Sequence, residues 1–229
     1  MSVVADYQDR LEIQSDLREE VGDVRDQQRR PVCIVFSISD LNRVCNQLND
    51  HLSVEYLCFT SAQNQNGWSP ECGFTYPSVA TALMDNGQPM ETEYPYQPED
   101  ISAPLNSPPN FDEKYYPSDG ILLRENSPDI IRAQLTAGRV VSLVIGVTDG
   151  FQNPEEGFVI DGDTEEDEYP GALHAVTCCG HSLSSETNRY FFLIKNSWGG
   201  YWADKGFCWV SETFIARHCK SIIVVKSDG

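Results

Sequence analysis

Apolar residues in the first half of the chain recur at spacings of three to five, which predicts helices with one buried face. Over residues 32–48 they fall at positions 32, 35, 36, 41, 44 and 48, and the helix is expected to end near Asn49. Ser53 can cap a second, short helix, because its hydroxyl can accept a hydrogen bond from the first turn. A third helix is predicted over residues 77–86, where Gly87 supplies a terminating residue.

The second half of the chain changes to short apolar runs rich in β-branched residues, which predicts strands. A helix begins at Ser127-Pro128-Asp129, where a cap, a proline and an early acid coincide, and it ends at Gly138. Strands are expected at residues 140–147, 157–160, 175–179, 190–195, 207–210 and 221–225. Helices first and strands second predict an α+β fold with an antiparallel, barrel-like sheet.

Chain length and proline content suggest how the two halves are joined. A chain of 229 residues with 40% hydrophobic residues suits one domain of two packed lobes. The proline-rich residues 95–120 are predicted to connect a helical lobe, about 17–118, to a β lobe, about 119–227. The whole chain, residues 1–229, is therefore predicted to be a single domain with its ligand site in the cleft between the lobes.

The net charge of −19 argues against nucleic acid and anionic membranes as partners, because phosphate binding needs concentrated Lys and Arg. It is compatible with a basic substrate. The longest apolar run, residues 140–147, is far too short to cross a bilayer. Residues 1–18 are polar and acidic and lack the apolar segment of a secretory signal, so we expect no secretion by that route.

Cys33 stands at the start of the first predicted helix, beside the positive end of the macrodipole and unpaired backbone N–H groups. Both favour a thiolate over a thiol. A thiolate nucleophile also needs a base and an oxyanion donor. Downstream, His174 stands at the start of an apolar run and Asn196 at the end of another. The alternative for Cys33 is a small buried hydrophobe.

Four features in this order resemble the papain-like cysteine peptidases. Gln27 precedes Cys33 by six positions, His174 follows, and Asn196 begins an Asn-Ser-Trp-Gly run that matches the family's run in full. The separations of the histidine and the asparagine from the cysteine also suit the family. Shorter matches are Asp16-Leu17-Arg18, Leu52-Ser53 and Tyr94-Pro95-Tyr96. The resemblance extends over about residues 16–227 and implies the papain-like two-lobe fold.

The resemblance implies a role for each matching residue. Cys33 is the nucleophile, and His174 pairs with it as imidazolium to thiolate and later protonates the leaving amine. Asn196 holds the orientation of His174, and Trp198 shields that hydrogen bond from water. Gln27 and the backbone N–H of Cys33 form the oxyanion hole. No cofactor is implied. Taken singly, each side chain has an ordinary structural alternative in a core, a turn or a solvated loop.

The sequence departs from the family beside the nucleophile and along the expected cleft. Ile34 follows the nucleophile where the family has Trp, and Pro31-Val32 replaces Gly-Ser. Phe74-Thr75 stands where the family places Gly-Gly beside the substrate backbone, so these side chains should narrow or reshape that subsite. The full set of expected substrate contacts is Phe74, Thr75, Leu173, Ala175 and Trp198.

Eight cysteines suggest disulfides, but the resemblance argues against them. Secreted members bridge a cysteine three positions before the nucleophile, where this chain has Arg30, to one near Cys72. Cys219 also lacks its expected mate. Unpaired halves suggest a reducing compartment, so we expect a cytoplasmic protein or one delivered into a host cytosol. The sequence given has no room for the inhibitory pro-segment that the resemblance implies. Either that segment has been removed, or activity is restrained by another route, for which a protein inhibitor or regulator is the expected partner.

Residues 161–168 contain six acids and are either a solvated loop or a segment that selects basic peptides at the cleft mouth. No metal site is expected, because the remaining cysteines and histidines of the second half fit no usual zinc spacing. These residues are Cys178, Cys179, His181, Cys208, His218 and Cys219.

The sequence favours a cofactor-free cysteine endopeptidase that hydrolyses a peptide or protein substrate through an acyl-enzyme intermediate. One alternative is a transpeptidase or transamidase that uses the same Cys-His-Asn site, with an amine in place of water. Another is a non-catalytic peptide-binding protein on the same fold. The complete Gln-Cys-His-Asn set opposes this last alternative, whereas the altered Ile34 and Phe74-Thr75 favour it.

Overall fold

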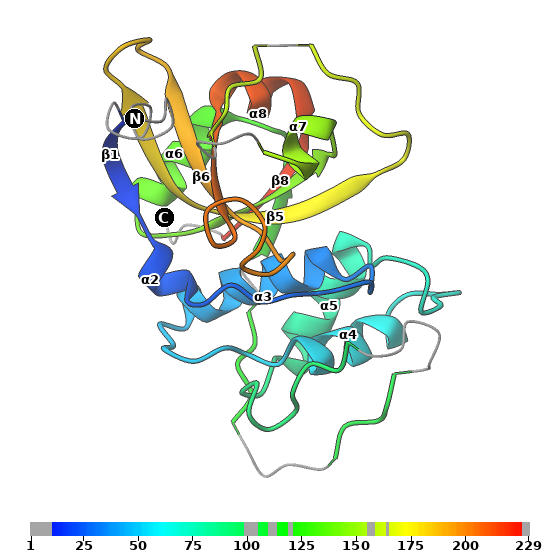
Figure 1. The fold of residues 1–229 in the computed structure, drawn as a ribbon. Coiled ribbons are helices and arrows are strands. Elements are labelled where there is room, and N and C mark those ends of the chain that lie inside the picture. Colours follow the sequence, from blue (N-terminus) through cyan, green and yellow to red (C-terminus); the bar gives the residue numbers. More distant parts are fainter. Residues whose placement is uncertain are drawn as a thin grey trace.

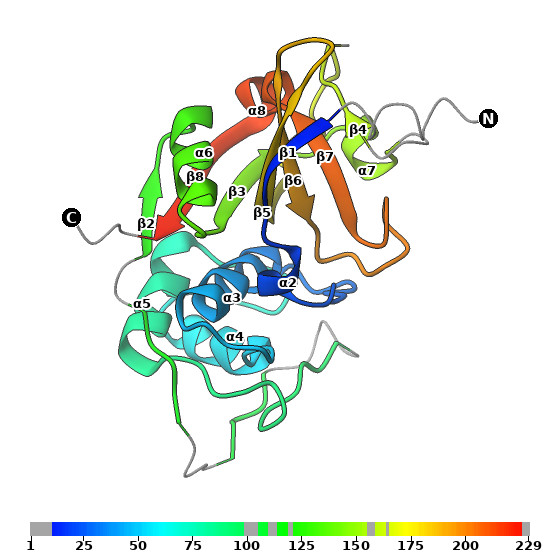
Figure 2. The ribbon, with the colours of Figure 1, turned by 90° about the vertical axis from the view of Figure 1, so that its left-hand side faces the viewer.

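A sheet and a group of helices occupy different parts of the molecule (Figure 1). The structure is a computed structural model that describes residues 11–98, 105–109, 114–118, 121–154, 159–163 and 165–225. Helix α3 (Cys33–Cys45) lies at the boundary between the two parts, where it packs against the sheet on one side and against the other helices of the first half on the other. Figure 2 shows the same two layers from the side.

The first-half helices form where the apolar spacing predicts them. Helix α3 ends before the predicted boundary, because Gln47 adopts a left-handed φ of 52°. Ser53 caps α4 (Val54–Gln63) as expected, since its Oγ accepts a hydrogen bond from the N–H of Tyr56 at 3.0 Å. Helix α5 (Tyr76–Asn86) begins one residue earlier than predicted.

Gly87 terminates α5 with a φ of 67°, a region that favours glycine. A Cβ atom at this position would also lie 2.9 Å from the backbone nitrogen of Pro117. The backbone of the next residue, Gln88, exchanges hydrogen bonds with Tyr116 at 3.1 and 2.9 Å. The end of α5 is thereby tied to the proline-rich connection.

Eight strands form one sheet with the order β2-β8-β3-β5-β6-β7-β4, and β1 pairs with another part of β5. The strands are β1 (Leu11–Asp16), β2 (Ile121–Arg124), β3 (Val141–Gly146), β4 (Val159–Ile160), β5 (Leu173–Ser184), β6 (Tyr190–Lys195), β7 (Phe207–Ser211) and β8 (Cys219–Val225). Their pairings are antiparallel, as expected, except that the two-residue strand β4 runs parallel to β7 at one edge. Of the strand predicted at 157–160, residues 157 and 158 lie outside the described residues.

Four further helices accompany the sheet: α2 (Arg18–Val21), α6 (Pro128–Thr136), α7 (Asp149–Gln152) and α8 (Glu212–His218). Only α6 follows from the sequence pattern. Its cap is Ser127, whose Oγ accepts a hydrogen bond from the N–H of Ile130 at 3.3 Å. The other three are two turns long or less, too short to show a helical period.

The sheet is covered on both faces. Adjacent residues of a strand point to opposite faces, yet Phe191 and Phe192 of β6 are both fully buried. One cluster of buried apolar residues runs from α3 through β3, β5 and β8. The start of α3 is therefore fixed against the centre of the sheet. Among the described residues, no helix combines the length and the apolarity needed to cross a membrane.

Candidate active site

Cys33 is the first residue of α3, and its side chain is partly buried at the boundary between helices and sheet. The backbone N–H of Ala175, the third residue of β5, forms a hydrogen bond with the thiol. This contact places the sulfur beside the strand that carries His174. Since α3 packs directly against β5, the helix that carries the nucleophile and the strand that carries the base are held together by the core.

His174 and Asn196 are joined by a short hydrogen bond. The distance between His174 Nε2 and Asn196 Oδ1 is 2.7 Å, and both side chains are buried. β5 and β6 are neighbours in the sheet, and Asn196 directly follows β6, so the strand pairing brings the two residues together. The contact leaves Nδ1 as the imidazole nitrogen available to a thiol.

The indole of Trp198 covers this pair. Its ring stacks on the imidazole of His174, with the centroids 4.5 Å apart and the planes at 28°. Phe151 of α7 lies edge-on to Trp198, with 5.7 Å between the centroids. Aromatic contacts therefore hold the imidazole in place and exclude water from its hydrogen bond.

Gln27 reaches the same region because the chain before α3 pairs with the residues after Asn196. The N–H of Gln27 donates to the carbonyl of Ser197 at 2.8 Å, and Asp26 forms a bridge with Trp198. The side chain is fixed at both ends. Its Oε1 accepts a hydrogen bond from Ser197 Oγ at 2.6 Å, and its Nε2 donates to the carbonyl of Arg30 at 2.8 Å.

Burial controls the protonation of the thiol and the imidazole. Burial raises the pKa of the Cys33 thiol, and hydrogen bonds from the backbone N–H groups of Ala175, Ile34 and Cys33 itself lower it by less. Burial also lowers the pKa of His174 to about 4, while the hydrogen bond with Asn196 raises it by less. Both directions favour the neutral thiol and imidazole. They oppose the resting thiolate–imidazolium pair expected from the helix dipole.

The comparisons with known proteins give one consistent family. The family model described as "Papain family cysteine protease" matches residues 11–223 of this chain. The chain belongs to the papain family of cysteine proteases.

Two curated relatives illustrate this family membership. The chain is 30% identical to pro-cathepsin H of Medicago truncatula over 209 residues, which cover 86% of this chain and 56% of that protein. It is 28% identical to cathepsin R of Mus musculus over 138 residues, which cover 59% of this chain and 39% of that protein. The chain thus spans about half the length of these relatives, or less.

Solved structures of papain-family proteases have the same fold. Xylellain from Xylella fastidiosa superposes with a TM-score of 0.75 at 17% identity, covering 94% of this chain and 86% of that chain. Bromelain from Ananas comosus, solved with the inhibitor E64, gives 0.66 at 18% identity, covering 93% and 98%. The predicted papain-like α+β fold is therefore confirmed.

The expected substrate contacts of this papain-family chain differ in exposure. Leu173, at the start of β5, is 60% exposed, whereas Ala175 is buried and offers its backbone N–H to the thiol. Thr75 is exposed, but its N–H already donates to Gln65 Oε1 at 2.8 Å. Phe74 is buried.

Trp68 explains the position of Phe74. The two rings are stacked, with centroids 5.3 Å apart and planes at 10°. This pairing turns the Phe74 ring toward the loop that follows α4. The neighbouring Gly73 borders the loop before the nucleophile, because a Cβ there would lie 3.4 Å from the carbonyl oxygen of Pro31.

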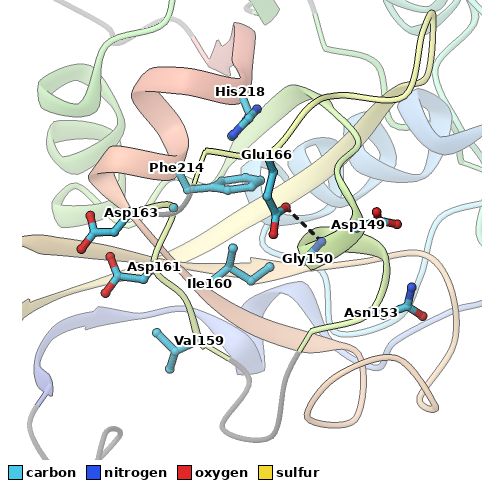
Figure 3. Close-up of a pocket in the computed structure, with 11 residues that line it drawn as sticks. Asp149, Gly150, Asn153, Val159, Ile160, Asp161, Asp163, Glu166, Phe214 and His218 are labelled. Atoms are coloured by element: carbon cyan, nitrogen blue, oxygen red, sulfur yellow. Dashed lines mark hydrogen bonds between the residues drawn. The ribbon is translucent and has the colours of Figure 1, made fainter.

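Three of the acidic residues of 161–168 line a pocket of about 570 Å³ in the sheet-containing part of the molecule: Asp161, Asp163 and Glu166. Figure 3 shows the side chains of Asp149, Asp161, Asp163 and Glu166 among the lining residues, together with Phe214. Several of these charges are matched. Arg189 pairs with Asp161 at 3.0 Å and with Asp163 at 2.6 Å, and Lys220 pairs with Glu168 at 2.7 Å.

A buried charge network beneath the site has no signal in the sequence. Lys195 Nζ lies 3.1 Å from Asp40 Oδ2, and Arg25 Nη2 lies 3.3 Å from Asp40 Oδ1. Burial raises the pKa of Asp40, but the charges of Lys195 and Arg25 hold it below its usual range. Because Lys195 directly precedes Asn196, the network fixes the chain that carries the asparagine.

None of the eight cysteines, all of which lie in the described residues, forms a disulfide, Cys72 and Cys219 included. Across the part of the chain that the structure describes, no three His, Cys, Asp or Glu side chains gather as they would to hold a metal ion.

Proposed function

We propose that this chain is a cysteine endopeptidase that cleaves peptide bonds through an acyl-enzyme intermediate on Cys33. The observation that carries the proposal is the buried His174–Asn196 hydrogen bond of 2.7 Å, next to the strand residue whose N–H binds the Cys33 thiol. This gives a nucleophile, a base and an orienting group in the arrangement that nucleophilic catalysis requires.

In the first step Cys33 Sγ attacks the scissile carbonyl carbon and its proton passes to His174. Since burial favours the neutral thiol and imidazole, we propose that this transfer accompanies attack instead of preceding it. The developing oxyanion accepts hydrogen bonds from Gln27 Nε2 and the backbone N–H of Cys33. Collapse of the tetrahedral intermediate breaks the C–N bond, and His174 gives its proton to the departing amine.

In the second step water attacks the thioester carbonyl. His174 takes a proton from the water, and the same two donors stabilise the second oxyanion. Collapse then breaks the C–S bond, releases the carboxylic acid product and returns the proton to the Cys33 sulfur. Asn196 keeps the imidazole aligned in both steps, because its Oδ1 accepts the Nε2 proton throughout.

The proposal is tested with a peptidyl epoxide, which alkylates a thiol only when a substrate-like pose brings it to the nucleophile. One equivalent should attach to Cys33, as found by intact mass and peptide mapping, and peptide hydrolysis should be lost in parallel. Cys33→Ala should abolish both, whereas Cys72→Ala should retain both, since Cys72 is an exposed thiol of the same chain. Hydrolysis that persists in Cys33→Ala would refute the proposal.

We propose further that the protein works in a reducing compartment, such as a cytoplasm or a host cytosol. The support is that none of the eight cysteines, each of them in the described part of the chain, forms a disulfide. A thiol titration of the unfolded protein purified without reductant should find eight thiols, and added reductant should leave the Tm unchanged. Two or more native disulfides would overturn this part of the proposal.

A further inference from the structure

The side chains of Arg30 and Glu55 form a buried ion pair next to Gln27. Arg30 Nη1 lies 2.5 Å from Glu55 Oε2, and the two side chains are only 7% and 4% exposed. Removing two charges from water has a desolvation penalty that can cancel most of the attraction between them. A gain in folding stability therefore does not by itself explain a buried ion pair. A role in positioning a neighbouring group explains it better.

We propose that Arg30, Glu55 and Tyr96 are positioning residues that hold the Gln27 amide in place as an oxyanion donor. The inference rests on the proposed peptidase function of the same site. It concerns three side chains that touch neither the nucleophile nor the base, and whose effect on the reaction passes through Gln27.

Two hydrogen bonds connect Gln27 to this group. Its Nε2 donates to the carbonyl oxygen of Arg30 at 2.8 Å, and its own carbonyl oxygen accepts from Tyr96 Oη at 2.9 Å. The Tyr96 ring in turn lies against the Arg30 guanidinium, with 4.8 Å between the guanidinium carbon and the ring centroid. The side chain of Gln27 is thus bound to the backbone of Arg30, and its main chain is bound to Tyr96, whose ring contacts the Arg30 guanidinium.

The bond from Gln27 to the Arg30 carbonyl decides where the second amide proton points. A primary amide carries two N–H bonds in one plane. Ser197 Oγ fixes the oxygen end, and the Arg30 carbonyl occupies one N–H, so the remaining N–H has a single direction. Oxyanion stabilisation depends on donors held within a few tenths of an ångström of the developing charge. A shift of the Arg30 carbonyl would therefore weaken it.

Glu55 anchors the arrangement to the helical part of the molecule. It lies in the first turn of α4, and its Oε2 also accepts a hydrogen bond from the N–H of Gln97 at 3.1 Å. Arg30 Nη1 donates to the carbonyl of the same Gln97 at 2.8 Å. The ion pair therefore joins three segments: the loop that carries Gln27, the start of α4, and the chain around Tyr96. Arg30 stands where the resemblance places a half-cystine in secreted members of the family, and its ion pair needs no oxidation.

Two variants test whether these residues position the Gln27 amide or only stabilise the fold. Tyr96→Phe keeps the ring over the guanidinium and removes only the hydroxyl that binds Gln27. The double variant Arg30→Met/Glu55→Gln removes the ion pair without leaving one charge buried alone. A matched control is Arg132→Met/Asp129→Asn, because Arg132 also pairs with an acid and also lies over a tyrosine ring, that of Tyr190.

The readout compares two reactions of Cys33. Peptide hydrolysis passes through an oxyanion, whereas alkylation by iodoacetamide attacks a saturated carbon and forms none. We expect kcat/KM for hydrolysis to fall roughly tenfold to a hundredfold in the double variant, mostly through kcat, and several-fold in Tyr96→Phe. The alkylation rate should stay within about twofold, and the control variant should match wild type in both reactions.

The inference is overturned if the variants lose hydrolysis and alkylation to the same extent. It is also overturned if both variants fold and hydrolyse peptide at the wild-type rate. If the double variant does not fold, Tyr96→Phe decides alone. If wild type alkylates but cleaves no peptide, the proposed function fails, and the ¹⁵N relaxation of the Gln27 side-chain amide still tests the positioning. That amide should be rigid in wild type and mobile in the variants, whereas equal rigidity in all of them would contradict the role of Arg30, Glu55 and Tyr96.

Discussion

At the scale of single residues, burial opposes the helix dipole at the nucleophile. The sequence indicates a thiolate at Cys33, because the start of a helix and a histidine elsewhere in the chain both stabilise negative charge on sulfur. The structure adds the packing of α3 against the sheet, which removes water from the thiol and from His174. Desolvation then favours the uncharged form of each group, and backbone donors compensate only in part.

Because burial outweighs the backbone donors, we predict that the alkylation rate of Cys33 in the free protein depends on pH in a specific way. Because burial raises the pKa of the thiol and lowers that of His174 to about 4, the thiolate should be scarce at pH 6. Its alkylation by iodoacetamide should rise roughly tenfold per pH unit through neutrality. Rates are measured by peptide mapping from pH 4 to 9, with exposed Cys72 as an internal reference. A rate that is flat from pH 5 to 8 would instead demonstrate a resting ion pair.

Some residues of the candidate site can be recognised from the sequence, and others can be identified only from the structure. Gln27, Cys33, His174 and Asn196 are recognisable because a motif and an order mark them. Arg30 and Glu55 are 25 positions apart and match no motif, so their pairing appears only when α4 is placed beside the loop. Likewise, only the structure shows that Trp68 provides a stacking partner for Phe74.

At the scale of elements, caps and periodicity predicted the long helices, whereas strand ends and short helices were missed. β5 is more than twice its predicted length. Its second part includes His181 and Ser182, which are buried although polar, and a register shift between Cys178 and Gly180 interrupts the alternation. A pattern of apolar residues cannot extend a strand through buried polar positions, because their burial depends on partners elsewhere in the chain. One such partner of His181 is Thr136, whose Oγ1 lies 3.1 Å from its Nε2.

Two serine caps should differ in their contribution to stability. Ser127→Ala removes one exposed cap bond of α6 and should lower the free energy of unfolding by about 1 kcal/mol. Ser53→Ala should cost more, roughly 2–3 kcal/mol, because Ser53 Oγ also donates to the buried carbonyl of Tyr94 at 2.6 Å. Urea unfolding measures both values. Equal losses would show that the Tyr94 hydrogen bond adds nothing, and peptide cleavage should survive Ser127→Ala unchanged.

The acidic segment permits a second element-scale prediction. Arg189 and Lys220 match part of its charge, but Glu165 and Asp167 remain exposed. If the segment attracts basic peptides, Glu165→Gln/Asp167→Asn should reduce the preference for Lys- and Arg-containing peptides about twofold to fivefold at low salt. At physiological salt, where the Debye length is roughly 8 Å, the difference should shrink. An unchanged ratio of basic to neutral peptide cleavage in this variant would identify the segment as a solvated surface.

At the scale of the whole molecule, the site is assembled from both parts of the fold. The nucleophile begins the helix at the boundary, the histidine lies at the start of β5, and the asparagine directly follows the neighbouring strand β6. The glutamine is held by a bridge between the chain before α3 and the chain after β6. The α+β class followed from the order of helices and strands. The parallel pairing of β4 with β7 and the participation of β1 did not, because sheet edges depend on long-range partners that local pattern does not encode.

Because the site lies at the boundary between helices and sheet, His174 is buried and its pKa is lowered. The free energy of unfolding should therefore depend on pH. His174 has a folded-state pKa of about 4, below the value near 6.5 expected in the unfolded chain, so the unfolded state binds more protons between these values. The neutral imidazole of His174 makes its full contribution to the free energy of unfolding above pH 6.5, and this contribution is lost as the pH falls toward 4. The loss from His174 should be about 2 kcal/mol between pH 7 and pH 4.5.

His174→Gln isolates this contribution, since glutamine carries no charge at either pH. Wild type and variant are compared by urea unfolding at pH 7 and at pH 4.5. Other groups titrate in the same range, among them His51, whose pKa burial lowers to about 3, but they act in both proteins and cancel from the comparison. The variant should therefore lose less stability than wild type on acidification. If the two proteins lose the same free energy, then His174 is protonated as readily in the folded protein as in the unfolded chain, and the resting imidazolium–thiolate pair regains its support.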